Sequence, residues 1–305
     1  MSHARSTVEV DVEGRRLRLS NLDKVMFPAT GFTKGQVIDY YTRVAPLLLP
    51  HLRGRPLTLK RYPNGVDGGH FYEKECPKHR PEWVQTATIP IRTGGRSVNF
   101  CLAEDLPTLV WTSNLADLEL HTSLSLAADI KTPTMMVFDL DPGAPATIVE
   151  CAQVGLVLKE IFGSLDLECF PKTSGSKGLQ IYVPLNTPTS YAKTKPFAHA
   201  LAQLLEKQLP KIVVSSMAKE LRRGKVLVDW SQNDEHKTTV CVYSLRAREQ
   251  PTVSLPVTWE EVEALLESAD PEHLLLTSDE VLDRLAKHGD LFAPALEMQQ
   301  ELPQL

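Results

Sequence analysis

Two aspartates stand at the end of an apolar segment, in the order Phe138, Asp139, Leu140, Asp141. If this segment is a strand, its side chains alternate between two faces, so both acids share one face with backbones about 6.5 Å apart at roughly 3.3 Å rise per residue. Phe138 and Leu140 then take the buried face, and the Pro-Gly pair at 142–143 is expected to end the strand. Carboxylates spaced in this way suit a pair of divalent cations that assist phosphoryl transfer. The alternative is a pair of structural acids on an edge strand.

A third acid, Asp229, directly follows another short apolar run. A carboxylate inside such a strand is costly to bury without a partner, and a cation shared with the first two acids is one suitable partner. A salt bridge to Arg222 or Arg223 is the other.

The segment 172–178, with the sequence Lys-Thr-Ser-Gly-Ser-Lys-Gly, lies between these acids. Its glycines expose backbone N–H groups, the hydroxyls of Ser174 and Ser176 can donate hydrogen bonds, and Lys177 supplies positive charge, as a phosphate-binding loop requires. The chain contains no G-x4-G-K-[ST] pattern, so this is not a Walker A loop. It is not a nucleophile elbow either, because the residue two positions before Ser176 is a serine. A plain Ser/Gly turn is the alternative.

The charge of the chain is unevenly distributed. Its net value is −5, but residues 257–305 carry twelve acids and two bases, so this tail has −10 and residues 1–256 have +5. A basic body beside an acidic tail suggests a polyanionic partner for the body, although two ordinary solvated faces would give the same numbers. Within the body, Arg246 and Arg248 are two residues apart and, on one strand face, would clamp a triphosphate together. Their alternative is an exposed basic edge.

Composition excludes several classes of protein. With 42% hydrophobic and 23% charged residues, the chain is not disordered, collagen-like or a coiled coil. No apolar run is long enough to span a membrane, and residues 1–5 lack the apolar stretch of a signal peptide, so we expect a cytoplasmic protein without membrane contact.

The cysteines do not indicate a metal site or a network of disulfides. The five residues, at positions 76, 101, 151, 169 and 241, form no C-x-x-C pair and are too scattered for a disulfide framework, which agrees with a reducing compartment. A zinc site could be assembled from His70, Cys76, His79 and Cys101, but only the spacing of Cys76 and His79 favours it.

Several helix starts and strands are visible in the pattern of residues. Capping boxes at 33–36, 147–150, 258–261 and 277–280 precede apolar residues with helical spacing, and 191–209 is a further helix. Segments 135–140, 179–185, 226–230 and 238–243 are predicted strands. This interleaving favours an α+β fold with mostly antiparallel sheets flanked by helices. It allows one domain over 1–305, with an N-terminal subdomain 1–130, a catalytic subdomain 131–305 and an acidic helical tail 257–305.

Taken together, the motifs resemble a known family. The segments 22–28 (Leu-Asp-Lys-Val-Met-Phe-Pro), 138–143, 174–179, 228–233 (Val-Asp-Trp-Ser-Gln-Asn), 243–248 (Tyr-Ser-Leu-Arg-Ala-Arg) and 251–253 occur in the order found in the polymerase domain of bacterial DNA ligase D. That domain belongs to the archaeo-eukaryotic primase superfamily and works in non-homologous end joining. The ligase motif K-x-D-G is absent, so the chain is similar to a stand-alone polymerase domain with a primase-like core.

The resemblance implies template-directed addition of nucleotides, preferentially ribonucleotides, to DNA 3′ ends with Mn²⁺ or Mg²⁺. By motif match, Asp139, Asp141 and Asp229 would be the catalytic metal carboxylates. The implied nucleotide-binding residues are Ser174, Ser176, Lys177, Gln180, Gln232, Arg246, His121 and Lys74; those for the 5′-phosphate of a gapped or broken DNA are Lys24, Lys34 and Arg61. The aromatic residues that precede Lys74 would stack near the template. A separate DNA ligase and a Ku-type end-binding protein, in a bacterial nucleoid, are the implied partners.

The chain departs from the family pattern at two positions. Gln180 replaces a histidine that contacts the triphosphate, and Thr122 replaces a proline after His121. Because glutamine cannot carry a charge, nucleotide affinity would be reduced, and a DNA 5′-phosphate-end-binding module with reduced or lost catalysis is the alternative function. A phosphatase or nucleotide-sugar site around Asp139 is a third hypothesis, against which Gly143 speaks because phosphatases carry Thr or Val there.

Overall fold

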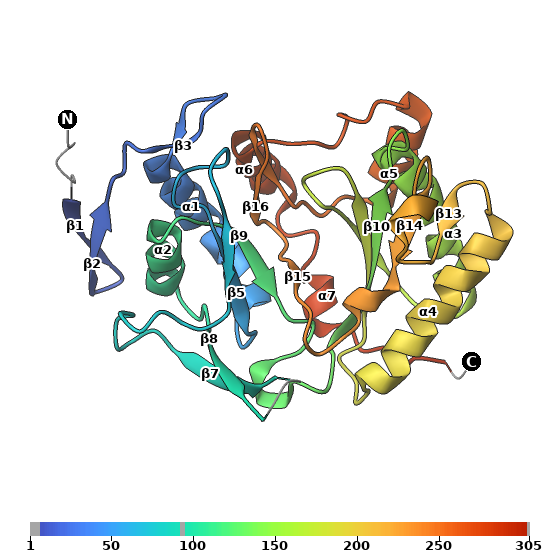
Figure 1. Ribbon diagram of the computed structural model, residues 1–305, viewed down its shortest axis with the longest axis horizontal. Coiled ribbons are helices and arrows are strands. Elements are labelled where there is room, and N and C mark those ends of the chain that lie inside the picture. The colour runs from blue at the N-terminus through green and yellow to red at the C-terminus, as the bar shows by residue number, and fades with distance from the viewer. Residues whose placement is uncertain (1–6, 92–94, 304–305) are drawn as a thin grey trace.

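The computed structural model describes residues 7–91 and 95–303; the N-terminal residues considered for a signal peptide lie outside these ranges. Figure 1 shows two sheets side by side, each covered by helices. The mostly antiparallel α+β fold predicted from the sequence is confirmed. In the described ranges, no helix is both long and apolar enough to cross a membrane.

The sheet that carries the acidic motifs has the strand order β11-β12-β10-β14-β13. Its strands are β10 (Met135–Pro142), β11 (Phe170–Thr173), β12 (Leu179–Pro184), β13 (Val213–Val214) and β14 (Val226–Asp229). Neighbouring strands are antiparallel except β13 and β14. Helices α3 (Ile148–Ser164) and α4 (Tyr191–Gln208) pack on it, and Phe138 and Leu140 of β10 lie in the core that they share. Val137 points to the opposite face, into a second core that reaches the other sheet.

The second sheet has the order β15-β9-β5-β8-β7, and β6 pairs with β5. Its strands are β5 (Leu57–Arg61), β6 (Phe71–Glu73), β7 (Thr86–Pro90), β8 (Ser97–Cys101), β9 (Asp117–Thr122) and β15 (Thr239–Val240). Helices α1 (Lys34–Leu52) and α2 (Leu106–Asn114) pack against each other and against this half. The proposed subdomain boundary near residue 130 falls between the two sheets, but β15 follows it in sequence and pairs with β9.

Shorter elements complete the described fold. Three strand pairs are β1 (Thr7–Val12) with β2 (Arg15–Ser20), β3 (Val25–Phe27) with β4 (Phe32–Thr33), and β16 (Leu245–Ala247) with β17 (Pro251–Val253). In the acidic tail, α5 (Trp259–Ser268) contacts α3, α6 (Ser278–His288) contacts α1, and α7 (Pro294–Glu297) contacts β12. Single 3₁₀ turns cover Ala127–Asp129, Lys219–Leu221 and Trp230–Gln232.

The predicted helices are found, and the predicted strands differ mainly in their ends. Each capping box starts a helix one residue after its threonine. Strand β10 runs through both acids to Pro142, whereas β15 keeps only two of the six residues predicted for it. Trp230 leaves the strand because the Asp229 side chain accepts a hydrogen bond from the Ser231 N–H and starts a 3₁₀ turn.

The prediction about the cysteines needs a correction. Cys76 and Cys101 form a disulfide, while Cys151, Cys169 and Cys241 are free and buried. Cys76 and Cys101 are 25 positions apart, and their spacing gave no sign of the pairing. A hydrogen bond from the Cys76 N–H to the carbonyl of Asn99, on β8, brings Cys76 close to Cys101 on the same strand. Since both sulfurs are bonded to each other, the weakly favoured zinc site is ruled out for these residues.

One glycine in the Ser/Gly segment is fixed by geometry. Gly175 has φ +63°, and a Cβ there would lie 2.4 Å from the carbonyl group of Val253. Gly175→Ala is therefore expected to lower the free energy of unfolding by more than about 1 kcal/mol. At Gly163, near the end of α3, an added Cβ would meet no atom within 4 Å, so Gly163→Ala should leave stability unchanged or raise it by up to about 1 kcal/mol. Urea unfolding measures the free energy of unfolding of both variants. Equal stability of the two would show that the backbone at residue 175 does not require glycine.

Candidate active site

The two acids of β10 share one face, as predicted. Phe138 and Leu140 are fully buried, whereas Asp139 and Asp141 are only partly buried at the open face of the strand. The antiparallel register of β10 and β14 places Asp139 directly opposite Asp229. Burial raises the pKa of Asp139 to about 6, and the nearby charge of Asp229 adds to this effect. The sheet thus brings two like charges together, an arrangement that a cation would relieve.

Asp229 and Asp141 have different partners. Asp229 accepts hydrogen bonds from Ser231 and from the Gln232 side chain at 2.9 Å, and the alternative partner Arg222 donates to the Met217 carbonyl instead. Asp141 lies 3.3 Å from the Lys177 ammonium, and this pair is largely exposed.

Carboxylate oxygens are the ligands that Mg²⁺ and Mn²⁺ prefer, so the chemistry of the three acids fits such an ion. The arrangement of Asp139 and Asp229 on paired strands fits it as well. However, no group of three His, Cys, Asp or Glu side chains within the described residues is close enough to hold a metal. The predicted convergence of all three acids is therefore not formed in this structure.

The predicted phosphate loop connects β11 to β12, but it uses two of its own amides. The Ser176 and Gly178 N–H groups donate to the Ser174 hydroxyl at 3.3 and 3.1 Å, so they are not free for a ligand as the sequence suggested. Arg246 donates to the Ser174 carbonyl. The Lys177 ammonium lies 3.3 Å from the Pro142 carbonyl at the end of β10. The loop therefore offers side-chain donors more than backbone donors.

A cavity of about 530 Å³ joins the two sheets and the loop. Most of the predicted site residues line it, namely Lys74, His121, Asp139, Asp141, Ser174, Ser176, Lys177, Gln180, Gln232 and Arg246. Asp229 lies beside it as the strand partner of Asp139. Arg248 lines a separate hollow with Pro28 and Ala29, so it does not clamp a ligand together with Arg246.

Sequence reasoning missed His236, Lys237 and Thr238, which also line the cavity. They follow Asp229 by fewer than ten residues, and this proximity in sequence was the available signal. Lys237 donates to the Ser231 hydroxyl, which also donates to Asp229.

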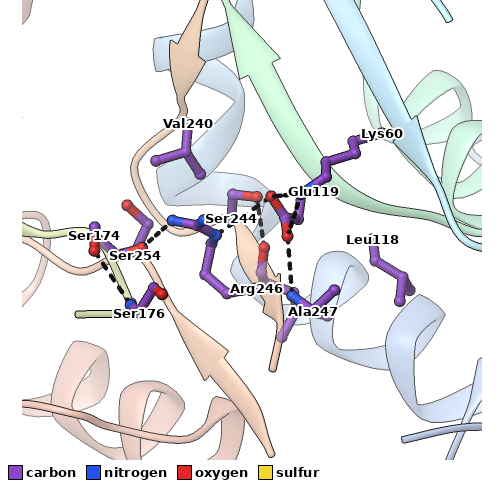
Figure 2. A network of polar contacts seen from close by, with 12 residues as sticks. Lys60, Leu118, Glu119, Ser174, Ser176, Val240, Ser244, Arg246, Ala247 and Ser254 are labelled. Atoms are coloured by element: carbon purple, nitrogen blue, oxygen red, sulfur yellow. Dashed lines mark hydrogen bonds and ion pairs between the residues drawn. The ribbon is translucent and has the colours of Figure 1, made fainter. Parts of the chain in front are cut away.

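Glu119 was also missed, although it connects the two halves of the site (Figure 2). Its buried carboxylate on β9 lies 3.1 Å from the Lys60 ammonium, 3.1 Å from His121 Nε2 and 3.4 Å from Arg246 Nε, and it accepts from the Ala247 N–H. Burial alone would raise the pKa of Glu119, but the hydrogen bond from His121 and the charges of Arg246 and Lys60 hold it well below its usual range. Burial lowers the pKa of His121.

The three cations predicted for DNA lie near one another, apart from the cavity. Lys34, at the start of α1, is buried and donates to the Ser20 carbonyl and the Asn114 side chain. Burial lowers its pKa to about 8, and the nearby charges of Lys24 and Arg61 contribute to this shift. Arg61 pairs with Glu73 at 2.7 Å. Together, Lys24, Lys34 and Arg61 form a positive cluster at a helix N-terminus, where an anion is favoured.

Comparisons with known proteins bear on the family of the chain. Residues 33–292 match the family described as LigD, primase-polymerase domain. The multifunctional non-homologous end joining protein LigD of Mycolicibacterium smegmatis is 44% identical over 281 residues, which are 92% of this chain and 36% of that protein. The bifunctional non-homologous end joining protein LigD of Bacillus subtilis is 33% identical, and the match covers 90% of this chain and 43% of that protein. The chain thus spans less than half the length of these relatives.

A solved structure, the polymerase domain from Mycobacterium tuberculosis ligase D in complex with DNA, superposes with a TM-score of 0.85 at 40% identity. The match covers 93% of this chain and 99% of that one. The resemblance drawn from the motifs is confirmed, and the chain belongs to the LigD primase-polymerase domain family.

Proposed function

We propose that this chain is a metal-dependent, template-directed polymerase that adds nucleotides to DNA 3′ ends at gaps or breaks during end joining. The observation that carries the proposal is a cavity lined by Asp139 and by the cationic side chains Lys177 and Arg246, with Asp229 directly opposite Asp139 on the neighbouring strand. Transfer of a nucleotide to a 3′-hydroxyl needs both the acids and the cationic side chains. The cationic side chains stabilise the charge of the triphosphate, and cations held by the acids would stabilise the charge on the attacking oxygen.

The cations and hydroxyls of the cavity are suited to the incoming nucleotide. Ser176, Lys177 and Arg246 would hold the triphosphate, with Ser174 fixing the loop and Gln232 and Lys74 completing the walls. His121 Nε2 carries the hydrogen, because it faces the Glu119 carboxylate, which only accepts. In neutral His121 the other ring nitrogen is then an acceptor suited to a ribose hydroxyl, which supports a preference for ribonucleotides.

Asp139, Asp141 and Asp229 would hold Mn²⁺ or Mg²⁺. Such a pair of ions, when bound, lowers the pKa of an attacking hydroxyl and neutralises charge on departing pyrophosphate. The positive cluster of Lys24, Lys34 and Arg61 would bind the 5′-phosphate on the far side of a gap. A DNA ligase and a Ku-type protein would then act on the same ends, in the bacterial nucleoid.

The first prediction from the proposed function concerns Asp139. Asp139→Ala should lower extension of a 5′-phosphorylated gapped duplex with Mn²⁺ and NTPs by at least about a hundredfold, because one carboxylate of the pair is lost. Asp283→Ala, at an exposed position of α6, is the control and should extend as the wild type does.

Equal extension by Asp139→Ala and the wild type would contradict the proposal. Salt-sensitive binding of 5′-phosphorylated ends without incorporation by the wild type, unaffected by Asp139→Ala, would instead support the alternative function, an end-binding module.

A second prediction concerns Glu119. Glu119→Gln removes the charge that faces Lys60 and Arg246, so we expect a loss of about 3 kcal/mol in the free energy of unfolding and a rise of about tenfold in KM for the nucleotide. Glu263→Gln, on α5, disrupts an exposed pair with Lys159 of α3 and should cost less than about 1 kcal/mol. Urea unfolding and steady-state kinetics check both values. If Glu119→Gln behaves as its control does, the carboxylate does not organise the site.

A third prediction follows from the lowered pKa of Lys34, about 8. Lys34 loses its proton as pH rises through that value. Its attraction to phosphate is therefore present below about pH 8 and lost above that pH. A 5′-phosphate, with a second pKa of about 6, stays a dianion from about pH 7 upward. The preference for 5′-phosphate over 5′-hydroxyl ends should therefore fall by about tenfold between about pH 7 and pH 10.

Fluorescence anisotropy of labelled duplexes measures this preference. Lys34→Gln should weaken the preference at pH 7 and flatten its pH dependence, whereas Lys287→Gln, on the exposed surface of α6, should keep the wild-type profile. A wild-type preference that stays constant with pH would show that Lys34 does not bind the phosphate.

A further inference from the structure

Four side chains form a row across the sheet beneath the cavity. The registers place Lys172 of β11 opposite Gln180 of β12, Gln180 opposite Asp139 of β10, and Asp139 opposite Asp229 of β14. The row therefore runs from a buried lysine through a neutral amide to the two acids.

Lys172 is completely buried, and its ammonium is fully hydrogen-bonded. Its three hydrogens meet three acceptors among the described residues: Gln180 Oε1 at 2.6 Å, the Ser254 hydroxyl and the Val240 carbonyl. The Ser254 hydroxyl donates onward to the Thr173 carbonyl, so it can accept from Lys172. This cation is thus held in place from several sides.

The contact with Lys172 decides which way the Gln180 amide faces. Lys172 Nζ donates to the amide oxygen, so the amide nitrogen faces the other way. That nitrogen donates to Asp139 Oδ1 at 3.2 Å. Gln180 is only 3% exposed, and its oxygen also lies 3.4 Å from the Tyr182 hydroxyl. Both ends of the amide are therefore engaged inside the protein.

We propose that Gln180, held by Lys172, is a positioning residue that orients the Asp139 carboxylate and is not a ligand of the triphosphate. It occupies one oxygen of Asp139 and leaves the other free for a cation. Hydrogen bonds that orient a metal-binding side chain in this way typically change metal affinity or activity by about 10- to 100-fold when they are removed. The role of Asp139 itself rests on the proposed function.

The test separates metal binding from nucleotide binding. Mn²⁺ binding without nucleotide is measured by electron paramagnetic resonance of the free ion, and kcat and KM for NTP are measured at saturating Mn²⁺. Gln180→Met keeps the length of the side chain but makes no bond to Asp139, and Lys172→Met removes the group that sets the amide. Gln203→Met, at an exposed position of α4, is the matched control.

We expect Gln180→Met to weaken Mn²⁺ binding by about 10- to 100-fold and to lower kcat, with KM for NTP within about threefold of the wild type. Lys172→Met should shift Mn²⁺ binding in the same direction, and Gln203→Met should change nothing. Thermal unfolding shows whether each variant is folded; should Gln180→Met not fold, Gln180→Asn, which keeps the amide but shortens the side chain, replaces it and should weaken Mn²⁺ binding as well.

A tenfold rise in KM for NTP with unchanged Mn²⁺ binding would overturn the proposal, because Gln180 would then bind the phosphates. Unchanged Mn²⁺ binding with unchanged KM would overturn it too, as would a wild type that binds no Mn²⁺. If the wild type incorporates no nucleotide but Gln180→Met still weakens Mn²⁺ binding, the proposed function fails and the positioning role stands.

Discussion

The antiparallel pairing of β10 with β12 and β14 is the constraint on which the site depends. It sets Asp139 between Gln180 on one side and Asp229 on the other. Two acids side by side in a partly buried place repel each other, and the raised pKa of Asp139 reflects this together with its burial. The hydrophobic effect opposes that repulsion, because the alternate side chains of β10 are buried against α3 and α4 and hold the strand in register.

The second sheet contributes through one buried carboxylate. Glu119 attracts Lys60 and His121 from its own sheet and Arg246 from β16, so charges that come from both parts of the chain meet at a single anion. Without that anion, Lys60 and Arg246 would repel each other at the edge of the cavity. The same balance changes when a triphosphate enters, because Arg246 then has a second negative partner. In the free protein the Glu119 carboxylate already neutralises Arg246. Arg246 therefore needs little rearrangement to bind the triphosphate in addition to Glu119.

The predictable parts of the structure are those with local physical causes. Capping boxes and the period of apolar residues determine α1, α3, α5 and α6, and alternation places Asp139 and Asp141 on one face. The row from Lys172 to Asp229 could not be predicted, because it depends on register between strands far apart in sequence. The Cys76–Cys101 disulfide escaped because it joins the segment between β6 and β7 to the end of β8, 25 positions away in sequence. Arg248 was misplaced because β16 ends at Ala247, so the alternation assumed for it does not continue.

The pairing of β15 with β9 has a consequence for synthesis of the chain. Strand β9 ends at Thr122, but its neighbour is made more than a hundred residues later, and Arg246 follows shortly after it. A nascent chain on the ribosome therefore cannot close the first sheet or build the cavity until both of these later segments have emerged. Contacts so distant in sequence are slow to form. Unfinished chains consequently expose one edge of β9 and hold no assembled site, so any polypeptide that carries the cavity has already joined its two sheets.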